Sequence, residues 1–185
     1  MSFMLLGILN SQAAGGGAGA YDLLETTTLT SSASSVTFSG LGSYSNYAHL
    51  QVRYTMRLDS AFDGGTLLYR LNSDSGSNYA RHQLIGSGSS VLSQASTTFN
   101  QAGYGIGGGA LANIFGTGVI DFLDFSSTAK NTTLRSLSGR VGAADSILLT
   151  SSLWNNTAAV TSLELYASND LVSGCRFSLY GIKGA

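Results

Sequence analysis

The side chains that could carry nucleophilic chemistry are few in this sequence. It contains two histidines, His49 and His82, and one cysteine, Cys175. Neither histidine belongs to a G-x-S-x-G pattern, in which a sharp turn presents a serine to a histidine base. Cys175 lies in the alternating stretch Gly174–Gly181, which predicts a small buried or edge residue, whereas a reactive thiolate needs a nearby cation or a helix N-terminus. These residues indicate neither a serine nor a cysteine enzyme, and a single cysteine forms no intrachain disulfide.

Two motifs resemble binding loops, but each lacks a part that its chemistry requires. The run at 103–108 matches G-x-G-x-x-G, yet no helix is expected after it because Gly116 and Gly118 interrupt the chain, so we predict a mobile glycine loop. The run at 72–78 places oxygen side chains at alternate positions, as in a calcium loop, without the final bidentate acid. A turn closed by Asx hydrogen bonds explains this second run equally well.

Acid–base catalysis by paired carboxylates finds little support either. Asp121 and Asp124 are predicted on one strand with side chains on opposite faces, and the only glutamates are Glu25 and Glu164. Two histidines and one cysteine at these separations do not predict a zinc site. We therefore expect no enzyme activity, no cofactor and no metal. An enzyme acting on polysaccharide and a glycan-binding surface with exposed tyrosines and Trp154 stay open as alternatives.

The charge of the chain restricts its partners. Only 10% of the 185 residues are charged and the formal net charge is -1, against about 25% charged residues in an ordinary domain. Nucleic acid binding needs clustered Lys and Arg, and the nine present here are scattered, so no nucleic-acid partner is expected. So few charges give little electrostatic protection against self-association, which an oligomer or a subunit of a larger shell tolerates.

Strand patterns dominate the rest of the sequence. In the stretch His49–Leu58, apolar and polar residues alternate over ten positions, a period of two that is typical of a half-buried strand. The same pattern recurs at Thr66–Leu71, Val119–Phe125, Val160–Tyr166 and Arg176–Ile182. Weaker candidates lie at Leu23–Leu29, Val36–Phe38, Arg81–Ile85, Thr132–Val141 and Ile147–Trp154. We predict an all-β fold, an antiparallel jelly roll or β-sandwich over residues 21–185, with at most a short helical turn near 109–113.

The first twenty residues have a different composition. An apolar run at 3–9 is followed by a Gly/Ala stretch at 13–20, with no Lys or Arg ahead of it as a signal peptide would have. Seven apolar residues are also too few to span a bilayer, so no membrane partner is expected. We predict residues 1–20 to be an arm with a glycine hinge, and an ordinary first strand is the alternative. The arm would bind a partner through its large apolar side chains, Phe3, Met4, Leu5, Leu6, Ile8 and Leu9.

Several strand sequences resemble a group of small structural proteins of tailed bacteriophages. They are the stretches at 21–30, 35–39, 47–53, 70–79, 121–124, 134–139 and 176–183, together with the opening run at 6–9. The resemblance implies a virion component, either a capsid decoration (cement) protein or a tail-fibre or baseplate receptor-binding knob that contacts host glycan. For the decoration protein it implies a homotrimer on the capsid surface that binds the major capsid protein, after assembly in the host cytoplasm. It carries over no functional residues, because the group has no catalytic motif.

Overall fold

The computed structural model of the chain describes residues 19–142 and 145–184. Within them lie twelve strands and one short 3-10 helix. The strands are β1 (Tyr21–Thr28), β2 (Ala33–Ser39), β3 (His49–Met56), β4 (Gly64–Leu71), β5 (Tyr79–Gly86), β6 (Val91–Ser96), β7 (Gln101–Ile106), β8 (Gly116–Leu123), β9 (Thr132–Arg140), β10 (Ser146–Trp154), β11 (Ser162–Leu171) and β12 (Arg176–Ile182), and the helix η1 spans Leu41–Tyr44. The predicted arm residues Phe3, Met4, Leu5, Leu6, Ile8 and Leu9 lie outside the described residues.

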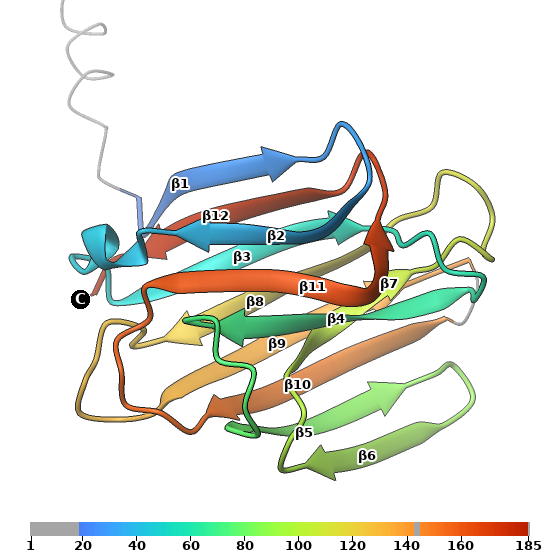
Figure 1. Cartoon of the computed structure of the whole chain (residues 1–185). Helices are drawn as coiled ribbons and strands as arrows, with labels where there is room; N and C mark the ends of the chain where they lie inside the picture. The colour runs from blue at the N-terminus through green and yellow to red at the C-terminus, as the bar shows by residue number, and fades with distance from the viewer. Residues whose placement is uncertain (1–18, 143–144, 185) are drawn as a thin grey trace, which may run out of the picture.

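The strands form two sheets of unequal width, which pack face to face (Figure 1). The large sheet has eight strands in the order β1-β12-β3-β8-β9-β10-β5-β6, and the small sheet has four in the order β2-β11-β4-β7. Every pair of neighbouring strands is antiparallel. The predicted all-β, jelly-roll-like sandwich is therefore confirmed.

The apolar core fills the space between the sheets, and alternation along the strands explains how it forms. In β3, Val52, Tyr54 and Met56 are buried, whereas Arg53 and Thr55 between them are exposed. The same pattern places Phe177 and Leu179 of β12 and Leu163 and Leu165 of β11 in one cluster. Each side chain of this kind contributes roughly 1.5–3 kcal/mol when it leaves water. The core therefore fixes which face of each strand points outward.

The sequence-based prediction was wrong for the glycine-rich run at 103–108. Its first four residues belong to β7, a buried strand of the small sheet, not to a mobile loop. A Cβ atom on Gly103 would lie 2.2 Å from the Tyr54 hydroxyl, and one on Gly105 would lie 2.7 Å from Met56. The glycines are therefore required because β7 passes directly over large side chains of β3. The segment at 109–113, the predicted helical turn, contains turns but no helix.

Candidate interaction surface

The two histidines and the cysteine do not contact one another, although His49 Nδ1 lies 3.5 Å from Oδ1 of Asp124. The ring of His49 accepts a hydrogen bond at Nδ1 from the backbone N–H of Asp124 (2.9 Å). His82 lies 3.0 Å from the Ser93 hydroxyl on the neighbouring strand, and no hydrogen bond or ion pair joins it to an acid among the described residues. The Cys175 thiol is buried and donates to the Arg57 carbonyl (3.2 Å), and burial raises its pKa, which keeps it protonated. None of these groups forms part of a nucleophile–base–acid series in the described part of the chain.

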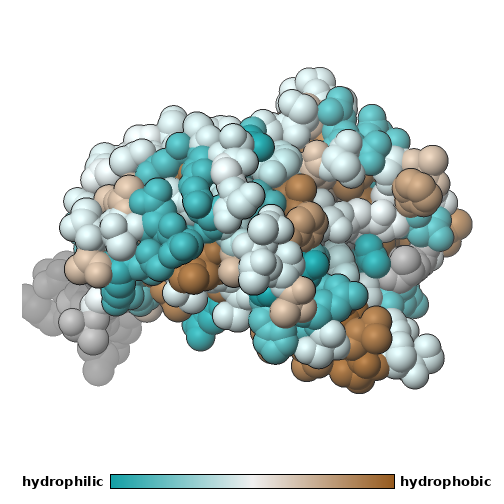
Figure 2. All heavy atoms as spheres, turned by 60° about the horizontal axis from the view of Figure 1, so that its bottom comes forward, coloured by the Kyte–Doolittle hydropathy of each residue, from teal (hydrophilic) through white to brown (hydrophobic). Residues whose placement is uncertain are grey.

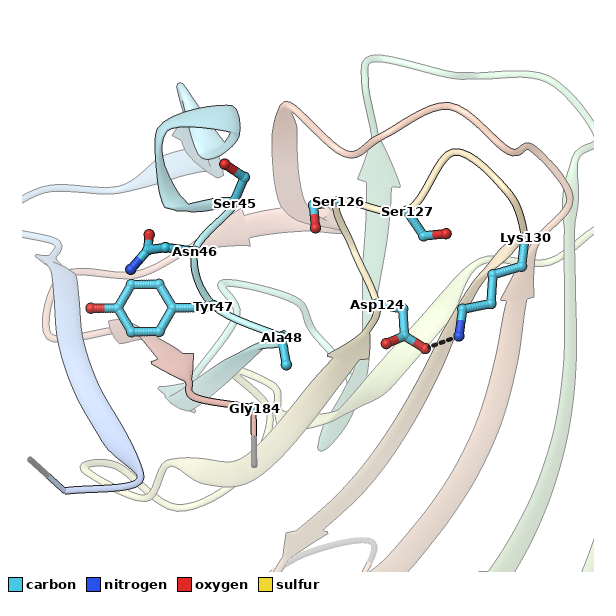
Figure 3. Close-up of a pocket in the computed structure, with 9 residues that line it drawn as sticks. All are labelled: Ser45, Asn46, Tyr47, Ala48, Asp124, Ser126, Ser127, Lys130 and Gly184. Carbon is cyan, nitrogen blue, oxygen red and sulfur yellow. Dashed lines mark ion pairs between the residues drawn. The ribbon is translucent and has the colours of Figure 1, made fainter.

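Asp121 and Asp124 do not lie on one strand as predicted. Asp121 belongs to β8, but Asp124 follows the end of that strand in a left-handed conformation with φ 52°. Asp124 lines a polar hollow of about 430 Å³ between the 45–48 turn and the 126–130 loop (Figure 3). Its carboxylate pairs with Lys130 at 2.5 Å, and the dashed line in Figure 3 marks this contact. Asp124 therefore contacts Lys130 in this hollow and lies apart from Asp121, which hydrogen-bonds with Gln51 and Arg135.

The calcium-like run at 72–78 is closed by its own hydrogen bonds. Oδ1 of Asp74 accepts from the backbone N–H of Gly76 (2.9 Å), which is an Asx turn. Oδ2 accepts from the side-chain amide of Asn78 (2.9 Å) and from the indole N–H of Trp154 (2.8 Å). These donors, the Trp154 indole first, lower the pKa of Asp74. Over residues 19–142 and 145–184, no three metal-ligating side chains of the His, Cys, Asp or Glu type come together.

The position of Trp154 corrects a second expectation. Its side chain is 1% exposed, inside the sandwich, and therefore cannot stack on a glycan as an exposed aromatic would. Tyr54, Tyr69 and Tyr79 are buried as well, and burial raises the pKa of Tyr79 to about 12. Trp154 therefore has no part in a glycan-binding surface, whereas Tyr21, at 47% exposed, is open to solvent.

The outer face of the large sheet carries a row of exposed aliphatic side chains. Leu137 is directly opposite Val119 on one side and Leu149 on the other, and Leu149 is opposite Leu84. These four residues, here called the aliphatic row, cross the adjacent strands β8, β9, β10 and β5. The three leucines are each about half exposed, at 49–52%. With strands about 4.8 Å apart, the row is roughly 14 Å long.

Beside the aliphatic row, polar side chains form a connected chain across β3, β8 and β9. Arg53 Nε donates to Gln51 Oε1 (2.9 Å), and Gln51 Nε2 donates to Asp121 Oδ1 (2.7 Å). Arg135 Nε donates to the other oxygen of Asp121 (2.9 Å). The guanidinium of Arg53 also stacks over the Tyr180 ring at 4.6 Å. This chain fixes Arg53, which is directly opposite Val119 at the end of the aliphatic row.

Figure 2 shows one face of the protein coloured by hydropathy. The visible surface is mostly teal and white, and brown apolar atoms gather in a few clusters, the most prominent near the bottom edge of the view. Exposed apolar patches that are surrounded by polar residues mark sites of interaction in soluble proteins. The aliphatic row is such a group of neighbouring side chains, so the outer face of the large sheet is our candidate for a functional surface.

Sequence reasoning missed the aliphatic row, although the sequence holds a signal for it. Alternation requires one face of an outer strand to be polar, but Ile147, Leu148 and Leu149 follow one another in β10, and Leu84 precedes Ile85 in β5. Such runs place apolar side chains on both faces of the sheet. In these strands one face packs on the core and the other faces solvent.

Comparisons with known proteins bear on the fold alone. No family model and no curated protein matches the sequence. Among solved structures, the carbohydrate-binding module CBM40 of a Ruminococcus gnavus IT-sialidase, bound to alpha2,3 sialyllactose, is similar at TM-score 0.38 and 9% identity, covering 85% of this chain and 91% of that one. An exo-inulinase from Aspergillus awamori is similar at TM-score 0.39 and 14% identity over 88% of this chain, which spans 29% of the inulinase. The galectin LEC-6 of Caenorhabditis elegans gives TM-score 0.29 and 10% identity, with 92% and 100% covered. We draw no function from likenesses at this level.

No helix in the described residues is long and apolar enough to span a membrane.

Proposed function

We propose that this chain is a non-enzymatic structural protein of a tailed-phage particle, a capsid decoration protein that binds the outer surface of the head. In this proposal it forms a homotrimer and stabilises contacts between major capsid subunits. The observation that carries the proposal is the aliphatic row, because exposed apolar side chains on a sheet face suit contact with another protein better than contact with a small polar substrate.

The size of the row fits a subunit that acts in many copies. Its half-exposed side chains, with Ile147 beside them, offer on the order of 300 Å² of apolar area, which gives roughly 8 kcal/mol on burial. Association costs about 4–15 kcal/mol in lost translation and rotation, so one such contact is marginal. An oligomer on a repetitive shell engages several contacts at once, and effective concentration then supplies the missing affinity.

The predicted arm belongs to the same proposal. Residues 1–20 would carry the apolar side chains Phe3, Met4, Leu5, Leu6, Ile8 and Leu9 to a neighbouring subunit. We expect a variant lacking residues 1–20 to fold and to lose attachment to capsids. If the shortened protein attaches as well as the full chain, the arm has no part in binding.

Location within the particle tests the proposal. Antibodies against the recombinant protein, coupled to gold, are applied to particles of the phage that carries the gene, and the label is counted by electron microscopy. Label spread over the whole head supports the decoration role. Label confined to the tail supports the alternative, a tail-fibre or baseplate receptor-binding knob, and glycan-array binding by the isolated protein would strengthen that alternative. Particles without label overturn both.

A further inference from the structure

Two adjoining hollows on the outer face of the large sheet share Arg53 and Thr117 in their walls. One is apolar and measures about 470 Å³, and the other is polar and measures about 260 Å³. We infer that together they bind a protein segment in which an aliphatic side chain lies next to an Asp or Glu carboxylate. The apolar hollow receives the aliphatic side chain, and Arg53 and Arg176 bind the carboxylate. This inference rests on the proposed role of the sheet face as a docking surface.

The apolar hollow exists because Gly139 has no side chain. Gly139 is directly opposite Thr117 on β8 and Ile147 on β10, so its missing Cβ leaves a gap in the outer face of three neighbouring strands. A Cβ atom built there would meet only the Ser146 carbonyl oxygen, at 3.7 Å. Val119 and Leu137 form further parts of the wall. The gap is therefore open to solvent and lined by aliphatic groups, which suits a side chain such as leucine or isoleucine.

The polar hollow holds two cations with no acid in its lining. Arg53 and Arg176 lie on neighbouring strands, opposite Ser178 and Thr55 respectively, a diagonal placement with Cα atoms about 7–8 Å apart. The side chain of Arg176 makes no hydrogen bond or ion pair within the described ranges, whereas its backbone is part of the sheet. Arg53 uses only Nε, toward Gln51, so both of its Nη groups are available to an incoming group. A free guanidinium fork binds a carboxylate with two parallel hydrogen bonds.

The surroundings of Arg53 prepare it for such a ligand. Its guanidinium lies over the Tyr180 ring at 4.6 Å and near the Tyr21 ring at 5.4 Å, and its Nε is held by the Gln51–Asp121 chain. A side chain that is already ordered loses less entropy when it binds. The nearest acid of the polar chain, Asp121, is occupied by Gln51 and Arg135. The charge of the hollow is therefore left for a partner to neutralise.

The two hollows together select a protein ligand. A chain of phosphates could pair with the two arginines but would gain nothing from the apolar hollow. A segment with an acidic residue beside an aliphatic one binds in both hollows. Because Arg53 and Val119 are direct neighbours across β3 and β8, the two groups of the ligand need to be only one strand spacing apart, about 5 Å. Adjacent residues of a peptide meet this requirement.

A small probe with both groups tests the inference on the full chain. 4-Methylpentanoate, which combines a leucine-like branch with a carboxylate, is titrated into ¹⁵N-labelled protein, and amide shifts are followed by NMR. We expect saturable shifts centred on Gly139, Val119 and Arg53, with a dissociation constant on the order of millimolar for so small a ligand. Its neutral amide, 4-methylpentanamide, should bind at least about fivefold more weakly. Equal binding of acid and amide would overturn the role of the arginines, and absence of shifts at these residues would overturn the site.

Substitutions locate the effect. Gly139→Leu fills the apolar hollow and should abolish saturable binding. Gly42→Leu, at a glycine outside the hollow whose Cβ position has no atom within 4 Å, should leave binding unchanged. Arg53→Gln and Arg176→Gln alter exposed side chains only, so they test the polar hollow even if Gly139→Leu fails to fold. Each should weaken 4-methylpentanoate several-fold and leave the amide unaffected. Full binding by these variants would contradict the inference.

Phage labelling, ligand binding and the Gly139→Leu variant together distinguish a failure of this inference from a failure of the proposed function. If phage particles carry no label but 4-methylpentanoate binds as expected, the decoration role is wrong and the site stands. If the label covers the head and Gly139→Leu attaches like the parent protein, the site is not the contact. Self-association that is seen by sedimentation equilibrium in the parent, and lost in Gly139→Leu, would make a second copy of this chain the occupant and would overturn the assignment to a different protein.

Discussion

The hydrogen bonds around Asp74 allow the effect of a single substitution to be worked out. Asp74→Ala removes both carboxylate oxygens and with them three hydrogen bonds, one from the indole N–H of the buried Trp154 and two from Gly76 and Asn78. A buried donor left without a partner costs about 1–3 kcal/mol, and the two exposed bonds, which water replaces, cost about 0.5 kcal/mol each. We expect a loss of about 3 kcal/mol in the free energy of unfolding, which lowers the Tm by about 6–12 °C in a chain of this size.

The pH dependence gives a sharper test of the same bonds. The pKa of Asp74 is lower in the folded than in the unfolded protein, so its carboxylate stabilises the fold above the unfolded pKa of about 3.9, and this contribution disappears as the pH falls through the folded pKa. Asp74→Asn should therefore be destabilised relative to the parent at pH 7 and approach it below about pH 4. Urea unfolding, monitored by Trp154 fluorescence at several pH values, measures the difference.

Two controls accompany this experiment. Asp170→Ala removes an exposed carboxylate on β11 and should change the free energy of unfolding by less than about 0.5 kcal/mol. Adding Ca²⁺ or a chelator should leave the Tm of the parent unchanged, since the loop oxygens of Asp74 already accept protein hydrogen bonds. A gap between parent and Asp74→Asn that stays constant from pH 7 to pH 3, or a Tm that rises with Ca²⁺, would refute the reasoning.

Three further substitutions test the packing and the surface. Gly103→Ala should lower the free energy of unfolding by about 2–3 kcal/mol, because its Cβ would lie 2.2 Å from the Tyr54 hydroxyl. Gly86→Ala, with open space around its Cβ position, should be neutral. Equal effects of the two substitutions in chemical denaturation would contradict the packing of β7 on β3. Thr150→Val should keep or raise the Tm, because the buried Thr150 hydroxyl has no hydrogen-bond partner among the described residues; a clear fall would mean that a bound water satisfies it. Leu149→Ser should leave the Tm within about 2 °C and weaken attachment to phage heads about tenfold, measured by co-sedimentation; unchanged attachment would remove the aliphatic row from the contact.

Strands with one buried face were predictable because apolar residues, which face the core, alternate with polar residues, which face solvent. All five strong patterns became strands, and so did the five weaker ones. β6 and β7 were missed for different reasons. In β6, from Val91 to Ser96, five of the six residues are exposed. No face of this strand is buried, so its sequence shows no alternation of apolar and polar residues. In β7, the glycines that allow close approach to Tyr54 look, in sequence alone, like a loop.

The candidate surface could be predicted only in part. Apolar runs such as Ile147–Leu149 reveal that a strand has apolar side chains on both faces, but they do not reveal which strands lie side by side. The aliphatic row depends on β8, β9, β10 and β5 being neighbours, although β5 is far from the others in the chain. The hollow at Gly139 is harder still, because it is made by a missing side chain, and its wall includes Arg53 of β3, which is far from Gly139 in the chain.

Because the two sheets differ in width, the strands of the large sheet also differ in local stability. The small sheet has four strands and the large one eight, and β6 lies at the outer edge of the large sheet, where Figure 1 shows the β5–β6 hairpin beyond the small sheet. Amide hydrogens in β6 should therefore exchange with deuterium far sooner than those of β3 and β12, because β6, in which five of six residues are exposed, can detach from β5 without disturbing the core. The strands near the centre of the large sheet are thus more stable than its β6 edge. The outer side of β6 has backbone N–H and C=O groups with which a strand of another molecule could pair.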